Sequence, residues 1–582
     1  MKKIFSAAAF LIICTNIFAQ ENPFVKLVEI TKEKNNVQAA RQFIIGSTCK
    51  TCVVQINNIP VKVYATGAFA YEVNLTSGKD TNFVISATNT DGKKATRNIG
   101  FLYTKPAPAE AVKTFGIESV QTFPEGNLIV TNGDKIQFRV KAFPNCTMAT
   151  INGTILYEMP TSQTKGIAGI YQGEYTVKPT DNFSSMKIPV TITNASGQKI
   201  TKETENKIGV LSSLGSDVCF TKGRLAHLEY GIGEDRLGGA KIGYIDSMIP
   251  LKIIGKVGEK YKVALTSIRS AYIPDNVVAL APRGTFAGPA LTERWQITGD
   301  EKYDYLTIGL TNKLPYQAFQ EIEPNKIIVD IFGATNNTNW ITQLQSAKEI
   351  KNVTYEQIQD GIFRVTIFLK SKQHWGHSVY YKGNILTVRV KQQPKSLALS
   401  KLTIAIDAGH GGSNTGAGGP TGSSEKELAL AVSLRLQEAL ENEGVKVIMT
   451  RTTEKFVDNK ERILLYRDNE PDLLISIHLN SSGDPIKSGG TSTMYKYIGF
   501  RNLSYFINKR MLQLGLKEYG NIGAFNFMLN SPTEYPNALI ETLFLSNPEE
   551  EALIMDPNFQ QKMADKIVVG IKDFLQNIEA NK

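Results

Sequence analysis

Hydrophobic and polar residues alternate in short runs over the first two thirds of the chain. Segments 61–64 and 83–87 show this pattern, and a Thr-Asp-Gly turn follows at residues 90–92. A period of two residues, interrupted by glycine, asparagine and aspartate, predicts β-strands joined by tight turns. Beyond a polar linker at residues 392–396, apolar runs alternate with amphipathic segments of helical length. That change predicts an α/β domain at the carboxyl end of the chain.

Two of the β-rich segments repeat each other. Residues 84–94 align with residues 189–199. The repeat predicts two tandem β-sandwiches, over residues 20–110 and 111–210, and both resemble immunoglobulin-like modules. Such modules usually act as spacers between domains or bind partners, and neither segment contains a catalytic set of residues.

The next two segments are also β-rich. Residues 211–285 have short strands with tight glycine turns, which predict a small barrel that resembles bacterial Src-homology-3-like domains. Residues 286–395 are similar to the AMIN domain, a β module credited with envelope targeting. His374 and His377 lie in this fourth segment without a carboxylate beside them. We therefore expect no second metal site there.

The first residues have the features of a secretory signal. Two lysines precede an apolar stretch at residues 4–13, and Ala19 is a suitable cleavage residue. The stretch is too short to span a bilayer, so we predict a signal peptide at residues 1–19. We expect an exported protein of the periplasm or cell envelope, without a transmembrane segment. A lipoprotein anchored through Cys14 is the alternative.

Charge and cysteine content add two constraints. The net charge of +10 indicates attraction to polyanions, but it does not separate a nucleic acid from an anionic cell-wall polymer. In an oxidising compartment, Cys49 and Cys52 are expected to form a local disulfide. The α/β domain contains no cysteine, which excludes a thiol nucleophile there.

Three candidate metal ligands lie at the ends of predicted elements in the α/β domain. His410 follows an apolar strand at residues 402–406, and His478 follows another at residues 472–477. Glu425 lies in the first turn of a predicted helix. Two imidazoles and one carboxylate suit a zinc ion (Zn2+) with a fourth position left for water. A structural role would explain each residue alone, whereas the set together indicates a metal centre.

The predicted helix begins near Ser424. Leu428 and Val432 recur at helical spacing, and Ser424 with Glu427 fits a capping box. The capping box gives Glu427 a local structural role. Glu425 then remains available for a site beyond the end of the helix.

Other polar residues accompany these three candidates. Glu541 ends an apolar strand, where a carboxylate costs desolvation energy unless it is paired or functional. It is either a general acid and base beside zinc or the partner of an arginine such as Arg451 or Arg462. The arginines themselves either bind substrate carboxylates or brace the fold. The full set of candidates for orienting the imidazoles or binding substrate is Asp407, Ser476, Asn480, Arg451 and Arg462.

These motifs resemble, in sequence order, those of zinc-dependent N-acetylmuramoyl-L-alanine amidases of the cell-division type. The resemblance implies an amidase catalytic domain over residues 396–582, with zinc held by His410, Glu425 and His478 and with Glu541 catalytic. It also implies that peptidoglycan is the substrate, cleaved between N-acetylmuramic acid and L-alanine. Nucleic acid is then not a partner, and the β modules are expected to bind envelope partners.

Two positions depart from the family pattern. Leu543 stands where glycine is usual, which is expected to alter the turn after Glu541. Asn530 stands where an arginine is often found, which puts recognition of the substrate peptide in doubt. Residues 483–502 are too few for the inhibitory helix that some relatives insert. We therefore expect a site that is open without an activator.

Two rival functions fit parts of the sequence. Four β modules ahead of one α/β domain would also suit an envelope-binding scaffold with a decayed hydrolase end, although all proposed ligands are present. A zinc deacetylase acting on wall sugars is the second rival. It would release acetate, whereas an amidase would release stem peptides.

Overall fold

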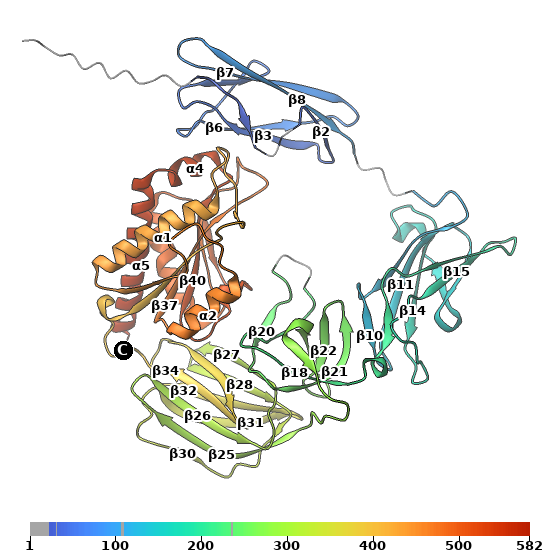
Figure 1. Ribbon diagram of the computed structural model, residues 1–582, viewed down its shortest axis with the longest axis vertical. Coiled ribbons are helices and arrows are strands. Elements are labelled where there is room, and N and C mark those ends of the chain that lie inside the picture. Colours follow the sequence, from blue (N-terminus) through green and yellow to red (C-terminus); the bar gives the residue numbers. More distant parts are fainter. Residues whose placement is uncertain (1–21, 29, 31, 106–109, 234–236, 582) are drawn as a thin grey trace, which may run out of the picture.

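The structure is a computed structural model, and four β-rich parts precede a domain with helices on both faces of a sheet (Figure 1). The predicted signal peptide lies outside the described residues. No helix in the described part of the chain is long and apolar enough to cross a membrane. The described residues are 22–28, 30, 32–105, 110–233 and 237–581.

The first module packs two sheets around one core, in which Ile44, Val54 and Ile85 are buried. Cys49 and Cys52 form the expected disulfide at the edge of this core. The three-stranded sheet has the order β1 (Lys26–Leu27), β3 (Arg41–Ser47), β6 (Ala68–Asn74). The five-stranded sheet has the order β2 (Lys34–Val37), β8 (Lys94–Tyr103), β7 (Asp80–Thr88), β4 (Val53–Ile56), β5 (Ile59–Val61).

The second module contains the other copy of the internal repeat. In each copy an asparagine closes a hairpin: the side-chain oxygens of Asn89 and Asn194 accept hydrogen bonds from backbone N–H groups two and four residues ahead. This side-chain-stabilised turn accounts for the aligned residues. The strand order is β16 (Lys199–Glu203), β15 (Pro189–Thr193), β12 (Thr147–Thr150), β13 (Thr154–Glu158), β14 (Ile170–Thr176), β11 (Lys135–Ala142), β9 (Ile117–Phe123).

A nine-stranded sheet joins the second and third modules. Two of its strands come from residues before 211, so the sheet continues across the expected boundary between these modules. The main path is β17 (Ile208–Val210), β10 (Leu128–Val130), β21 (Pro250–Val257), β22 (Lys260–Ala264), β23 (Ser270–Pro274), β19 (His227–Glu229), β20 (Lys241–Tyr244). Beside β21 lies β18 (Val218–Thr221), which pairs in turn with β24 (Val278–Leu280).

The fourth module has two sheets, and its core is continuous with that of the third module from Cys219 to Val390. His374 and His377 are buried here, and burial lowers the pKa of His374 to about 4 and that of His377 to about 3. One sheet has the order β29 (Ala334–Thr335), β25 (Ala290–Gly299), β26 (Tyr303–Leu310), β34 (Ile385–Lys391), β33 (His377–Lys382), with β30 (Ile341–Gln343) beside β25. The other has the order β27 (Tyr316–Ile322), β28 (Asn325–Phe332), β32 (Ile362–Leu369), β31 (Ile350–Gln359).

The carboxyl-terminal domain is the expected α/β domain. Its six-stranded sheet has the order β36 (Lys446–Met449), β35 (Thr403–Ala408), β37 (Leu473–Asn480), β40 (Asn537–Phe544), β38 (Thr491–Met494), β39 (Glu518–Ile522). The first four strands are parallel, and β38 is antiparallel to β40. The buried face toward α1 (Glu425–Asn442), α3 (Arg501–Met511) and α5 (Pro557–Ala580) is apolar, whereas α2 (Asn459–Asn469) covers the other face. A short helix, α4 (Pro548–Ile554), follows β40.

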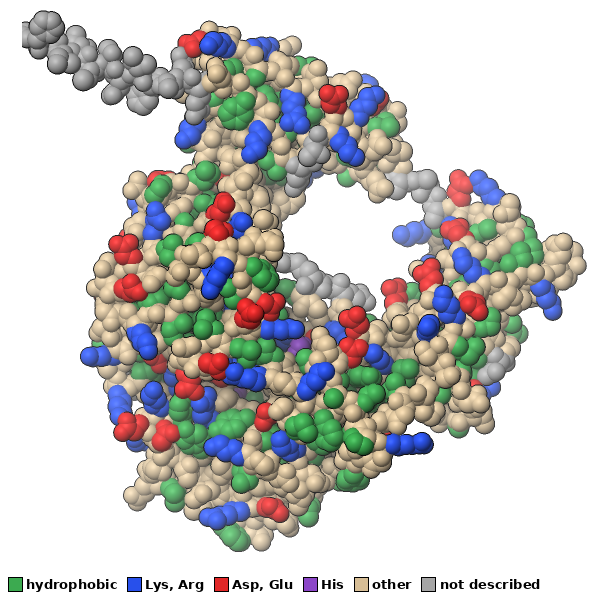
Figure 2. Space-filling model, in the orientation of Figure 1, with side chains coloured by type: hydrophobic (Ala, Val, Ile, Leu, Met, Phe, Trp, Pro, Cys, Tyr) green, Lys and Arg blue, Asp and Glu red, His purple; other side chains and the backbone are tan. Residues whose placement is uncertain are grey.

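Ionic and polar groups connect the first module to the carboxyl-terminal domain. Arg41 donates a hydrogen bond to Asp484 over 2.6 Å, and Lys26 donates one to the carbonyl of Thr421 over 3.2 Å. The first module therefore lies against the carboxyl-terminal domain, above α4 in Figure 1. Figure 2 shows an opening between these two parts and the second module.

Candidate active site

His410 lies in the loop that follows β35. Its backbone φ of 58° is left-handed, a conformation that the glycines on both sides help the chain to enter and leave. At Gly409, an added Cβ would lie 2.5 Å from Cε1 of His478, so only glycine permits the loop to pass this close. His410 Nδ1 is 3.0 Å from Asn414 Oδ1, which leaves Nε2 for the site.

Glu425 is the first residue of α1 and is 4% exposed. Ser424 is the N-cap, but its hydroxyl makes no capping hydrogen bond, so the predicted capping box is wrong. The loop before the helix supplies the acceptor instead, because the Lys426 N–H donates to the carbonyl of Thr415. Glu425 Oε2 in turn accepts a hydrogen bond from the backbone N–H of Ala417 over 2.7 Å.

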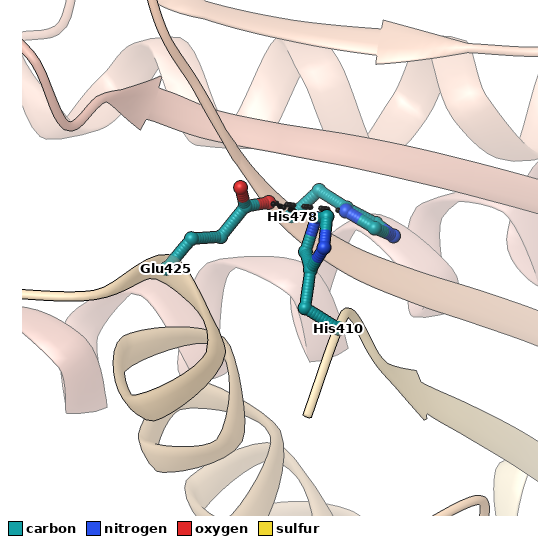
Figure 3. A group of neighbouring side chains, drawn as sticks. All are labelled: His410, Glu425 and His478. Carbon is teal, nitrogen blue, oxygen red and sulfur yellow. Dashed lines mark hydrogen bonds and ion pairs between the residues drawn. The ribbon is translucent and has the colours of Figure 1, made fainter. Parts of the chain in front are cut away.

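His478 is buried near the carboxyl end of β37. Its Nδ1 is 3.1 Å from Glu425 Oε1, and His410 Nε2 is also 3.1 Å from that oxygen (Figure 3). One ligand atom from each of the three residues lies within 4.8 Å of the others. The structure therefore brings together all three side chains that the sequence singled out as metal ligands.

The neighbouring side chains favour the charged forms of Glu425 and His478. Burial raises the pKa of Glu425, but hydrogen bonds from His410 and His478 outweigh burial and hold that pKa well below its usual range. Burial lowers the pKa of His478, but the hydrogen bond to Glu425 and nearby carboxylates outweigh it, so that pKa is raised.

Glu541 lies on β40 directly opposite His478 on β37. It also lies opposite Ser492 on β38. Residues that face each other on neighbouring strands project from the same side of a sheet. The Glu541 carboxylate is therefore on the side that carries the histidine, and its charge contributes to the raised pKa of His478.

Asp407 organises the floor of the site. Its carboxylate is fully buried and accepts hydrogen bonds from Ser476 over 2.6 Å, Thr450 over 3.1 Å and Arg462 over 2.6 Å. Burial raises the pKa of Asp407, but the charge of Arg462 and the other partners hold it below the usual value. Asp407 Oδ2 lies 4.0 Å from His478 Nε2, so the carboxylate faces the imidazole.

The two candidate arginines are buried and hold the loop around His410. Arg462 donates to the carbonyls of Ala408 and His410 as well as to Asp407. Arg451 donates to the carbonyls of Ala408, Gly409 and Lys426. In these contacts neither guanidinium is paired with Glu541, and both hold the backbone carbonyls of the loop around His410.

The structure also places three other positions that the sequence singled out, namely Asn480, Leu543 and Asn530. Asn480 accepts a hydrogen bond from the Ser481 N–H at the end of β37 and does not orient an imidazole there. Leu543 is buried inside β40, which continues to Phe544, so the expected effect on a turn after Glu541 is wrong. Asn530 is buried and donates to the carbonyl of Met494.

The sequence analysis missed three residues near the site. Asn414 positions His410, and its place in a glycine-rich loop was the only signal for it. The ring of Phe527 lies 5.7 Å from that of His478, centroid to centroid. Glu551 on α4 is buried and accepts hydrogen bonds from Thr421 and Ser423, which anchors the loop leading to the metal-ligand helix.

The segment between β37 and β38 is a loop. Residues 481–497 are all described, and none is helical. The loop leads into β38, and a single 3-10 turn, Ile498–Phe500, then precedes α3. No inserted helix lies in this stretch, in agreement with its short sequence.

Comparisons with known proteins place these observations in a family. Residues 404–573 match the family described as N-acetylmuramoyl-L-alanine amidase, and residues 295–399 match the AMIN domain. The germination-specific N-acetylmuramoyl-L-alanine amidase of Bacillus subtilis is 35% identical over 198 residues, which cover 31% of this chain and 82% of that protein. The N-acetylmuramoyl-L-alanine amidase AmiC of Neisseria meningitidis serogroup B is 24% identical over 387 residues, covering 51% of this chain and 93% of that protein.

A solved structure gives a similar match. The catalytic domain of CwlV, an N-acetylmuramoyl-L-alanine amidase from Bacillus (Paenibacillus) polymyxa var. colistinus, is 32% identical and has a TM-score of 0.29, covering 30% of this chain and 98% of that chain. The expected amidase and AMIN domains are confirmed, whereas the immunoglobulin-like and Src-homology-3-like types of the other modules stay predictions. The chain belongs to the N-acetylmuramoyl-L-alanine amidase family.

Proposed function

We propose that this amidase is a zinc-dependent peptidoglycan hydrolase that cleaves the amide bond between N-acetylmuramic acid and L-alanine of the stem peptide. The observation that carries the proposal is the convergence of His410, Glu425 and His478, whose ligand atoms lie within 4.8 Å of one another. The matched family is named for this reaction.

The donor set fits zinc. Two imidazole nitrogens and a carboxylate oxygen are typical ligands of catalytic zinc sites, which keep a fourth position open. Asn414 bonds His410 Nδ1 and leaves His410 Nε2 toward the site, and His478 presents Nδ1 to the same Glu425 oxygen, so one nitrogen of each ring is placed to bind a metal. A zinc ion held here supplies Lewis-acid activation for hydrolysis at neutral pH.

Glu541 is the proposed proton carrier. Its carboxylate accepts a proton from the attacking water and delivers one to the departing nitrogen of L-alanine. The position opposite His478 supports this role because it places the carboxylate beside the metal ligands. Proton delivery matters because an amine leaves far more readily than an amide anion.

Asp407 and Ser476 are proposed to hold His478 in place rather than to react. The buried carboxylate faces the imidazole, and Ser476 fixes that carboxylate through a hydrogen bond of 2.6 Å. Polar partners of metal ligands set the orientation of the ring and its basicity. Arg451 and Arg462 support the same loop through its carbonyl groups.

The remaining parts of the chain suit work at the cell envelope. We propose that residues 1–19 direct export to the periplasm or cell envelope and that the β modules, at 20–110, 111–210, 211–285 and 286–395, bind envelope partners. The match to the AMIN domain and the net charge of +10 support association with an anionic wall. No activator is proposed, because no inserted helix follows β37 in the described segment.

Digestion of purified peptidoglycan with the zinc-loaded protein tests the function. Mass spectrometry is expected to find free stem peptides that begin with L-alanine, together with peptide-free glycans. Unchanged polymer with tight binding would identify a scaffold. Release of acetate with intact muropeptides would identify a deacetylase.

A further inference from the structure

A group of positive side chains lies where the third module meets the catalytic domain. This lysine cluster consists of Lys241 and Lys260 from the module and Lys496 from the catalytic domain. Lys260 donates a hydrogen bond to Glu229, which is only 5% exposed, and Lys241 lies opposite Glu229 on the neighbouring strand. Among the described residues of this cluster, Lys260 alone forms an ion pair with the Glu229 carboxylate.

Among the described residues, the hydrogen-bond partners of Lys496 are neutral. Its Nζ lies 3.4 Å from Asn526 Oδ1 and 3.3 Å from Ser531 Oγ. The backbone N–H of Lys241 donates to the same Asn526 oxygen over 3.1 Å, which ties the two lysine positions together. No ion pair of Lys241 or Lys496 occurs in the part of the chain that the structure describes.

Partial burial of Lys241 and Lys496 without an ion pair of their own has an electrostatic cost, which the charge of Glu229 offsets only in part. Desolvation, followed by repulsion from Lys241, lowers the pKa of Lys496 to about 7. Burial also lowers the pKa of Lys241. A bound anion offsets this cost because a nearby opposite charge favours the ammonium form.

The lysine cluster is joined to the candidate metal centre through one short segment. Asn526 contacts Lys496, and the next residue, Phe527, packs against His478 with ring centroids 5.7 Å apart. A second segment, from Ser492 to Lys496, also joins the cluster to the site, because Ser492 lies opposite Glu541. Ser492 and Lys496 are four residues apart, a span of at most about 14 Å. A peptide of four residues has the same reach.

We propose that the lysine cluster binds the terminal carboxylate of the stem peptide whose first amide bond lies at the metal centre. The identity of this ligand rests on the proposed function. Lys241 and Lys496 donate charge-assisted hydrogen bonds to the two carboxylate oxygens, and Asn526 keeps the lysines in register. The third module thereby completes the peptide site of the catalytic domain.

Direct binding of the cleaved product tests this site without relying on catalysis. Isothermal titration calorimetry of the full chain would compare a four-residue stem peptide bearing a free terminal carboxylate with the same peptide bearing a terminal amide. Wild-type protein is expected to bind the acid about tenfold more tightly than the amide, the size of one charged hydrogen bond. Lys241→Gln and Lys496→Gln should each remove most of this preference.

Two variants make the comparison sharper. Lys496→Arg keeps the charge and should retain a preference for the acid. Lys252→Gln alters an exposed lysine of the same module that pairs with Asp217, and it should behave as wild type. Thermal unfolding of each variant checks that the fold is intact.

Three results would overturn the inference. They are equal binding of acid and amide by the wild type, no detectable binding of either peptide, and an unchanged preference in the double variant Lys241→Gln/Lys496→Gln. The proposed function fails by a separate result, namely no release of stem peptides from peptidoglycan. Binding with a charge-dependent preference would then still support the carboxylate site.

Discussion

Glu541 on β40 and His478 on β37 are direct neighbours across two parallel strands. Neighbouring strands lie about 4.8 Å apart, so a carboxylate at one position and an imidazole at the other belong to a single site. Glu425 approaches the same imidazole from the start of α1. The sheet and the helix together thus bring the proposed metal ligands and the proposed proton carrier together from distant stretches of sequence.

The first prediction concerns Glu541. Glu541→Gln should lower kcat by about 100-fold or more, the usual contribution of a general acid and base, while bound zinc stays at the wild-type level. Mass spectrometry of the released products measures turnover, and mass spectrometry of the protein measures its zinc content. Glu549→Gln changes a largely exposed carboxylate and should leave kcat unchanged. Full turnover by zinc-loaded Glu541→Gln would show that another group moves the proton.

The second prediction concerns the metal. Chelation should abolish hydrolysis, and added zinc should restore it in the wild type but not in Glu425→Ala, because that variant lacks one of three ligands. Glu427→Ala is the matched control, since Glu427 is exposed two residues further along the same helix. Zinc binding by Glu425→Ala with wild-type affinity would contradict the assigned ligand set.

The third prediction concerns the buried pair of Arg462 and Asp407. Both side chains are at most 2% exposed, and removing one leaves a buried charge without its partner. Arg462→Met should lower the free energy of unfolding of the catalytic domain by about 3–5 kcal/mol. Lys572→Met, which breaks an exposed pair with Glu443, should cost at most about 1 kcal/mol. Similar losses in denaturant unfolding for the two variants would refute this ranking.

The fourth prediction follows from the pKa of Lys496, which is about 7. Lys496 carries its positive charge below that pH and loses it above, so binding of the acid peptide should weaken between pH 6 and pH 8. The amide peptide should show no such change. Besides burial, the charged groups that act on Lys496 are Lys241, which lowers its pKa, and Glu229, which raises it. Burial lowers the pKa of Lys241 itself, whereas burial raises the pKa of Glu229 but hydrogen bonds with His227 and Lys260 outweigh it and hold that pKa below its usual value. Lys496→Arg should flatten the profile, and an unaltered profile in that variant would assign the pH dependence elsewhere.

The sequence predicted the candidate site well because its signals are local. An apolar run ends shortly before His410 and another leads directly into His478, and each run indicates a strand whose end carries a candidate ligand. Parallel strands bring their carboxyl ends to one edge, so two such patterns imply proximity. The helix at Glu425 was visible from its period, although its predicted cap was wrong because a distant carbonyl replaced the Ser424 hydroxyl.

Contacts between distant segments could not be predicted in this way. Phe527 meets His478 only because a loop folds back over the sheet, and nothing in the residues around Phe527 encodes that path. Likewise, β10 and β17 have ordinary strand patterns, but the sheet they join belongs to another part of the chain. The alternation of apolar and polar residues indicates which side chains of a strand are buried, whereas the strand with which it pairs depends on the whole fold.

The continuous core of the third and fourth modules has a consequence for dissecting the protein. Ala271 and Trp295 belong to the same buried cluster, on either side of residue 285. A truncation at that residue would therefore expose apolar surface that both halves normally cover, and neither half would retain its full stability. These two modules should melt as one cooperative unit, so a fragment intended to carry either of them needs to extend across residue 285 and include both. A fragment that begins at residue 211 would also lose β10 and β17 from the sheet of the third module.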